Sequence, residues 1–260
     1  MPNKTDSRFV GSLNKAFLVL NAIQHSERGL SLGKIQESTA LDISTVQRCV
    51  FTLVQLGFLV KDTHPVRAYR LASRFLDLSY GALRQDPMIR VAAAHIDETQ
   101  THCPFTIWFS VLDADELLYT LRKKGESYMK SLFAGRRVPL YCTAGGRAVM
   151  SHLADERIRE ILKRTRLTAY TPYTLTTEKE ILKAVEQAKR QGYAVACQEI
   201  RVGEIVAGSA VLNHDKAPIG AVHVSAATRK VSPDTAKATV APVAVNVAEL
   251  ISADLANYRI

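Results

Sequence analysis

Residues 31–71, SLGKIQESTALDISTVQRCVFTLVQLGFLVKDTHPVRAYRL, decide the fold of the N-terminal part of the chain. The middle of this stretch carries apolar side chains at helical spacing, which places them on one stripe of a helix that faces a core. They are Val46, Cys49, Val50, Leu53 and Leu56. The predicted helix ends at Gly57, because glycine suits the left-handed position after a helix.

The start of this helix is polar and falls away from the apolar stripe. Ser44, Thr45, Gln47 and Arg48 are short or forked hydrogen-bonding side chains, the chemistry that reads base edges and phosphates in a DNA major groove. Two N-caps compete here, Asp42 and a capping box of Ser44 with Gln47. Either cap begins a helix near this point.

Flanking segments complete a winged helix-turn-helix. A short helix over 32–38 precedes, and another amphipathic helix can pack behind the pair; its apolar residues are Leu13, Ala16, Phe17, Leu20 and Ile23. Residues 58–60 and 67–71 read as two strands of a wing with a turn at His64-Pro65 and a basic tip that includes Arg67. A small helical domain without a wing is the alternative that periodicity alone leaves open.

Positive charge is concentrated near the N-terminus of the 260-residue chain. The formal net charge is +9, and residues 1–75 hold ten Lys or Arg against five Asp or Glu. A basic N-terminal domain fits attraction to a polyanion such as double-stranded DNA, and this attraction falls with salt. An ordinary solvated basic surface would explain the same charge, so charge only supports the motif.

Cysteine spacing and the lack of long apolar runs narrow the class of protein. The scattered Cys49, Cys103, Cys142 and Cys197 have the spacing of neither a zinc site nor a redox CxxC pair. We therefore expect reduced thiols, no metal and no cofactor. No signal peptide and no run of 18 apolar residues is seen, which predicts a cytoplasmic protein without a membrane segment.

The patterns divide the chain into four segments. They are a disordered polar tail over 1–7, the winged helix-turn-helix domain over 8–72, a linker helix over 73–86 and a second domain over 87–260. The linker helix is expected to be interrupted near Gly81, and its apolar stripe makes it a reasonable dimer element.

The second domain alternates groups of strands with helices. Strands are predicted over 105–112, 116–122, 193–198, 204–212 and 219–225, and one last helix over 233–257 with Ser232 as its N-cap. Asp86-Pro87 supplies an N-cap and a first-turn proline for the helix that opens this domain. Helices between and after two groups of strands favour an α+β domain on one antiparallel sheet.

A glycine pair marks the most informative stretch of this domain. Gly145 and Gly146 follow Thr143 in the first turn of a predicted helix. Close approach of a carboxylate or phosphate to the backbone is one explanation, and tight packing of the helix on a sheet is the other.

Polar residues on two predicted neighbouring strands are a second candidate site. Glu204 and Val206 share one face of a strand, and His223 and Ser225 share one face of the next. Such side chains can line a pocket together, although a strand histidine is more often a satisfied core residue.

Catalytic chemistry finds little support in the sequence. GxSxG, HExxH, P-loop and dinucleotide-binding patterns are absent. Cys142 would need a histidine beside it to act as a nucleophile, and nothing in the sequence specifies one. His95 and His102 lack a third metal ligand at helical spacing.

Residues 9–257 resemble the IclR family of bacterial transcriptional regulators. The resemblance rests on STVQRCVFTLVQLGFLVKD with the following RAYRLA, on PLYCTAGGRAVMSHL, and on QGYAVACQEIRVGEIVAGSAVLN leading to IGAVHVSAATRKVS. It implies a winged helix domain that dimerises, a linker helix and a C-terminal GAF-like domain that binds a small organic effector. Dimers often pair into tetramers in this family.

The resemblance also implies where the effector lies. Carried over position by position, the family's pocket corresponds to Ala144, Gly145, Ala196, Glu204, Val206, His223 and Ser225. The chain departs from the family at Ala196-Cys197, where acidic residues are common, and at 208–211, where an Ala-Ala-Pro-like run is common. Loss of an acidic acceptor at Ala196 suits a larger or more anionic ligand than a hydroxy acid. We therefore expect an aromatic carboxylate held by the Gly145 end of the helix.

These observations predict a ligand-responsive DNA-binding regulator. A homodimer, or a tetramer, would contact a palindromic operator; the residues expected at the DNA are Ser44, Thr45, Gln47, Arg48 and Arg67. The alternative is a metabolite-binding enzyme with an appended helical domain. A purely architectural DNA binder is disfavoured, because it would not need so large a second domain.

Overall fold

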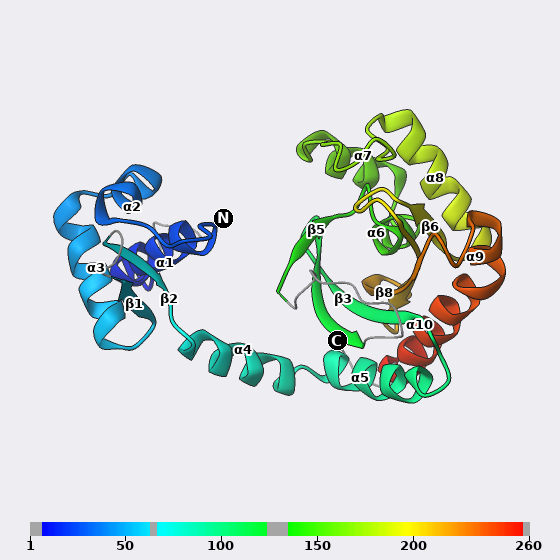
Figure 1. The fold of residues 1–260 in the computed structure, drawn as a ribbon, viewed down its shortest axis with the longest axis horizontal. Coiled ribbons are helices and arrows are strands. Elements are labelled where there is room, and N and C mark those ends of the chain that lie inside the picture. The colour runs from blue at the N-terminus through cyan, green and yellow to red at the C-terminus, as the bar shows by residue number, and fades with distance from the viewer. Residues whose placement is uncertain (1–6, 63–66, 124–134, 257–260) are drawn as a thin grey trace. The chain divides into compact units, whose positions relative to one another are not determined.

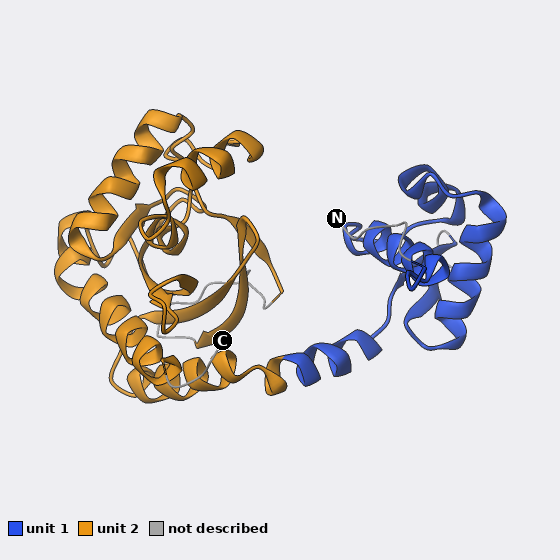
Figure 2. Cartoon of the chain, turned by 180° about the vertical axis from the view of Figure 1, so that it is seen from behind, with its two compact units in different colours: residues 1–82 blue, residues 83–260 orange. Residues whose placement is uncertain are grey.

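Two compact units make up the chain. The computed structural model describes residues 7–62, 67–123 and 135–256. Contacts divide the chain into residues 1–82 and residues 83–260, which are coloured separately in Figure 2.

The boundary between the units falls inside helix α4 (Arg74–Gln85). This helix runs through Gly81 without a break, so the predicted interruption is wrong. One glycine inside a helix costs only about 1 kcal/mol, which is too little to end it. The predicted wing turn at His64-Pro65 and residues 1–6 of the predicted tail lie outside the described residues.

The N-terminal unit is a winged helix-turn-helix, as predicted (Figure 1). Its elements in chain order are α1 (Gly11–Gln24), α2 (Leu32–Thr39), α3 (Ile43–Gln55), β1 (Leu59–Asp62) and β2 (Ala68–Leu71). The two strands of the wing are antiparallel, with Leu59 opposite Leu71. One apolar core joins the three helices to the first strand.

Helix α3 begins at Asp42, which is one of the two predicted caps. The Asp42 carboxylate accepts hydrogen bonds from the Thr45 backbone N–H at 2.8 Å and from the Ser44 hydroxyl at 2.6 Å. These bonds hold the pKa of the Asp42 carboxyl well below its usual range. Ser44 therefore acts as a donor to the cap, and the predicted capping box does not form.

The core of this unit is narrower than the predicted stripe of α3. Val46, Val50 and Leu53 are buried and Cys49 is partly buried, but Leu56 is 52% exposed. The prediction that all five apolar residues of the α3 stripe face the core is wrong for Leu56, because the other helices do not cover the end of the stripe.

Helix α1 departs from its prediction in the same way. Leu20 and Ile23 are buried, whereas Leu13 and Phe17 are exposed, Phe17 by 60%. Some of the exposed apolar residues of α1, α3 and α4 line a hollow, called here the apolar groove. Its apolar lining is Leu13, Ala16, Phe17, Leu20, Cys49, Leu53, Leu56, Phe58, Phe75 and Leu78, and its polar lining is Ser12, Lys15, Thr45, Arg48 and Thr52.

The C-terminal unit is an α+β domain on one antiparallel sheet, as predicted. The sheet has the order β5-β4-β3-β8-β7-β6, with strands β3 (Thr106–Asp113), β4 (Glu116–Lys123), β5 (Arg137–Pro139), β6 (Ala194–Cys197), β7 (Glu204–Leu212) and β8 (Pro218–Ala227). Its helices are α5 (Pro87–Gln100), α6 (Ala144–Met150), α7 (Asp155–Arg164), α8 (Glu178–Gln191), α9 (Pro233–Thr239) and α10 (Ala241–Leu255).

Alternation along the strands gives the sheet two different faces. Ile107, Phe109 and Val222 point to one side and form an apolar core with α5, α9 and α10. Trp108 and His223, which oppose each other in the β3–β8 register, point to the other side, where α6 packs (Figure 1). The second side carries the candidate ligand site.

The predicted last helix is two helices, α9 and α10, which meet at Val240. Pro242 has no N–H and its ring clashes with the carbonyl four residues earlier, which explains the break. The stretch Pro233–Leu255 is long and apolar enough by composition to cross a membrane. However, the apolar face of α10 is packed in the core against the sheet, as expected for a core helix of a globular domain.

Candidate functional sites

The predicted DNA-contacting residues lie at the start of α3 and before β2. Ser44, Gln47 and Arg48 are exposed, Thr45 is half-buried, and Arg67 is exposed at the edge of the wing. The polar leading end of α3 is therefore open to solvent within this unit, with the geometry that a recognition helix needs.

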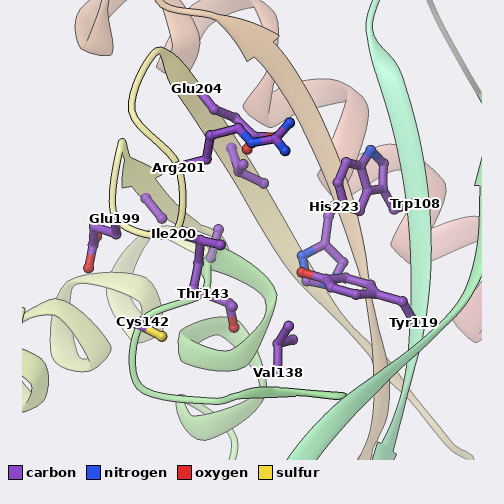
Figure 3. A pocket seen from close by; sticks show the side chains of 13 residues that line it. Trp108, Tyr119, Val138, Cys142, Thr143, Glu199, Ile200, Arg201, Glu204 and His223 are labelled. Carbon is purple, nitrogen blue, oxygen red and sulfur yellow. The ribbon is translucent and has the colours of Figure 1, made fainter. Parts of the chain in front are cut away.

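A cavity lies between the sheet and the start of α6 in the C-terminal unit (Figure 3). The space in it that the centre of a water-sized sphere can occupy is about 30 Å³. Its lining comprises Trp108, Tyr119, Val138, Cys142, Thr143, Ala144, Ala196, Glu199, Ile200, Arg201, Glu204, Val206 and His223.

Most of the predicted effector residues lie on this cavity. Ala144, Ala196, Glu204, Val206 and His223 all contribute to its wall. The remaining two do not line it: Ser225 is buried beside Val206 in the sheet, and Gly145 is packed under His223.

The glycine pair serves packing. A Cβ on Gly145 would lie 2.6 Å from His223 Nε2 and 2.8 Å from the Ala221 Cβ, and one on Gly208 would lie 2.7 Å from the Gly145 Cα. Real Cβ atoms do not approach so closely, so the first turn of α6 sits directly on β7 and β8. The predicted hold of a carboxylate by the Gly145 end is not supported, because Gly208 covers that backbone.

His223 is an uncharged wall residue. It is almost fully buried, and burial lowers its pKa to about 3. Its Nε2 shares a 2.8 Å hydrogen bond with the Ser110 hydroxyl, and its ring meets Tyr119 edge-on with centroids 5.2 Å apart. His223 therefore supplies shape and a fixed dipole to the cavity.

Glu204 is a buried acid at the other end of the cavity. Burial raises its pKa to about 7, against the opposing effect of the charges of Arg201 and Arg122 and of the Ser225 hydroxyl. Figure 3 shows the Arg201 side chain extending toward Glu204. The loss of an acidic side chain at Ala196 does not leave the wall without an acid, because Glu204, which was predicted to line the pocket, supplies one.

A buried ion pair joins α6 to the loop that forms one edge of the cavity. The Arg147 guanidinium pairs with the Glu199 carboxylate, and its Nε donates to the Tyr141 carbonyl at 2.9 Å. Glu199 also accepts from the Leu175 N–H at 3.3 Å, and its side chain points away from the cavity in Figure 3. This pair fixes the loop that carries Arg201.

Among the wall residues that sequence reasoning missed are Trp108, Tyr119 and Arg201. Trp108 is the single tryptophan of the chain and its ring lies 5.2 Å from that of Tyr119. The alternation of residues 105–112 would have placed Trp108 on one face of a strand. Nothing local says that this strand pairs with β8, which brings Trp108 beside His223.

Matches to two family models decide the family. The model of the IclR helix-turn-helix domain matches residues 12–63, and that of the bacterial transcriptional regulator IclR C-terminal domain matches residues 80–253. The chain belongs to the IclR family of bacterial transcriptional regulators. This IclR-family regulator is thus a DNA-binding protein with an effector domain, and its relatives are named as regulators of transcription.

Known relatives align with most of the chain, in sequence or in structure. The Pca regulon regulatory protein of Pseudomonas putida is 30% identical over 200 residues, which cover 76% of this chain and 68% of the relative. The crystal structure of Thermotoga maritima IclR has a TM-score of 0.71 and 24% identity, covering 95% of this chain and 99% of that one. An IclR homologue from Microbacterium hydrocarbonoxydans, solved with 4-hydroxybenzoate, has a TM-score of 0.74 and 22% identity, covering 94% and 98%.

The Cys142 thiol has the surroundings of a buried structural cysteine. Burial raises the pKa of the Cys142 thiol to about 12, so it stays protonated and is not an activated nucleophile. Across residues 7–62, 67–123 and 135–256, no three His, Cys, Asp or Glu side chains gather as metal ligands.

Proposed function

We propose that this protein is a cytoplasmic transcriptional regulator that binds a palindromic operator as a dimer and responds to a small organic acid, an aromatic carboxylate. The observation that carries the proposal is the pairing of an exposed polar helix start on α3 with a largely buried cavity that has both aromatic walls and a cation. Each half of the proposal has its own support and its own test.

The apolar groove supports dimer formation. Phe17 and Leu56 expose large apolar side chains on α1 and α3, and Leu78 on α4 lines the same hollow. A contiguous apolar surface is costly in water and marks an interaction site. Thr45 and Arg48 lie on the polar side of the same hollow, so a second copy seated on the apolar side alone would leave them free and place two α3 helices for successive major grooves of a twofold operator.

Sedimentation of matched variants tests the dimer. Phe17→Glu or Leu56→Glu puts a charge in the apolar groove and is expected to give a monomer. Phe51→Glu is the control, because Phe51 is also exposed on α3 but does not line the groove. Equal dissociation of all three variants, or of none, would contradict the proposed interface; a mass of four chains would indicate a tetramer of such dimers.

The cavity supports recognition of an aromatic acid. Trp108 and Tyr119 form an aromatic wall, and Arg201 brings a positive charge to the mouth of the cavity. The Arg201 guanidinium, rather than the Gly145 end of α6, is the better partner for a carboxylate. A relative named for the Pca regulon and a homologue solved with 4-hydroxybenzoate are consistent with this class of ligand.

Selection of DNA from random duplexes by the purified protein tests the whole proposal. We expect an inverted repeat whose half-sites lie about one helical turn, roughly 10 base pairs, apart. Affinity for that duplex is then measured with and without each of a panel of aromatic and aliphatic acids. An unchanged affinity with every acid would refute the effector half, and enrichment of no sequence would refute the operator half.

A further inference from the structure

Two buried polar atoms on the cavity wall have no hydrogen-bond partner within the described part of the chain. They are the indole Nε1 of Trp108 and the carboxylate Oε1 of Glu204, each in a residue only 4% exposed. Both residues line the same cavity, from β3 and from the start of β7.

Their neighbours do not account for either atom. The Trp108 ring is packed by Tyr119 and by the Arg122 guanidinium, whose Cζ lies 5.3 Å from the ring centroid, and these contacts use its faces and edges rather than its N–H. By contrast, the other buried acid of the wall, Glu199, is satisfied by Arg147 and the Leu175 N–H. A buried donor or acceptor without a partner is strongly unfavourable, so native sites rarely contain one without a reason.

The two atoms require opposite chemistry from whatever fills the cavity. The indole N–H can only donate, so it needs an acceptor, whereas a carboxylate oxygen needs a donor. The hydroxyl of Tyr119, which likewise lines the cavity, and the guanidinium of Arg201 add further donors. A plain carboxylic acid would satisfy the donors and leave the Oε1 atom of Glu204 without one, because the Ser225 hydroxyl bonds the carboxylate but Oε1 has no partner.

We infer that the ligand is a hydroxylated carboxylic acid, whose hydroxyl donates to Glu204 Oε1 and whose acceptor oxygens receive the Trp108 N–H. This inference rests on the effector role proposed above and adds a requirement to it. Glu204 is then a specificity-determining residue: an acid that lacks the hydroxyl leaves one buried carboxylate oxygen, Oε1, without a donor, and such a loss discriminates strongly between ligands.

Calorimetry with paired ligands tests the inference. Each hydroxylated acid, aromatic or aliphatic, is compared with the analogue in which a hydrogen atom replaces the hydroxyl, so that the donor is lost without added bulk. We expect at least one pair in which the hydroxylated member binds about tenfold or more tightly, as expected for loss of a hydrogen bond to a charged group. Quenching or enhancement of the single tryptophan, Trp108, reports binding in the same cavity.

Matched variants assign the preference to Glu204. Glu204→Met keeps the side-chain length without an acceptor and should bring the two affinities of the best pair to within about threefold. Val206→Ala changes another wall residue and should leave the ratio intact. Trp108→Phe should weaken both members equally, because both keep the acceptor.

The outcomes separate this inference from the proposed function. Binding of acids with a ratio near one in the wild type, or a ratio that survives in Glu204→Met, overturns the inference and leaves an acid-responsive regulator. Silence from every acid overturns both the inference and the effector half of the proposed function, while operator binding is measured independently on the same samples.

Discussion

Gly145 and His223 occupy one space between α6 and β8. A Cβ at position 145 would lie 2.6 Å from His223 Nε2, so only glycine lets the helix rest on the strand while the imidazole stays in the cavity wall. Gly145→Ala should therefore displace His223 and lower the free energy of unfolding by about 1–3 kcal/mol.

Trp108 fluorescence follows this change because the only tryptophan lies in the C-terminal unit. Urea unfolding of Gly145→Ala should show an earlier transition than the wild type. Gly81→Ala is the control, since a Cβ there meets open space and the tryptophan-detected transition should not move. Equal midpoints for Gly145→Ala and the wild type would contradict the packing role.

Arg48 is exposed at the leading end of α3. If it contacts a base, Arg48→Ala should cost roughly 1–3 kcal/mol of operator affinity and relax the preference at one base pair. Fluorescence anisotropy with operator variants measures both effects. Gln55→Ala, at the far end of the same exposed face, should change little; equal loss on every duplex would instead make Arg48 a phosphate contact.

The pKa of Glu204, raised to about 7 by burial, makes binding of a hydroxylated acid pH-dependent. A hydroxyl that donates to the carboxylate favours the ionised form, so binding expels a proton below pH 7. Affinity should thus rise about tenfold from pH 6 to pH 8, as the ionised fraction does.

The other groups around Glu204 leave this sign unchanged. His223 stays neutral over the range because burial lowers its pKa to about 3. Glu204→Met should give a flat profile between pH 6 and pH 8. An affinity that falls with rising pH would mean that the protonated carboxyl donates to the ligand instead.

Removing one member of the buried Arg147–Glu199 pair should be strongly destabilising. Arg147→Met leaves the Glu199 carboxylate buried without its cation, which typically costs about 3–5 kcal/mol. The double variant Arg147→Met with Glu199→Leu should recover part of this loss. Arg159→Ala, which breaks the exposed pair with Glu178, should change the stability by less than about 1 kcal/mol; similar losses at both sites would contradict the argument.

Local signals predicted most of the fold. The stripe from Val46 to Leu53, the caps Asp42 and Ser232, and the strand segments 204–212 and 219–225 each depend on a few neighbouring residues, and the structure confirms them. The exposure of Leu56 was not predicted, because periodicity gives the direction of an apolar side chain but not the extent of the surface that covers it.

The candidate site was harder to predict, since it is assembled from distant segments. Trp108 reaches His223 only through the β3–β8 pairing, which joins residues more than a hundred positions apart. The glycine pair correctly indicated that something approaches the backbone closely. However, a glycine that makes room for a ligand and one that makes room for a neighbouring strand look the same in a sequence. Only the position of Gly208 separates the two explanations.

In this cavity, the residues that set the distance between α6 and the sheet differ from the residues proposed to select the ligand. Glycines set how close α6 comes to the sheet, whereas Trp108 and Glu204 project from strands whose backbone pairing does not depend on their side chains. Replacing either of these two side chains by another would change which metabolite is recognised and would leave the backbone scaffold intact. A regulator built in this way can acquire a new chemical signal in one or two substitutions and keep its control of the same genes.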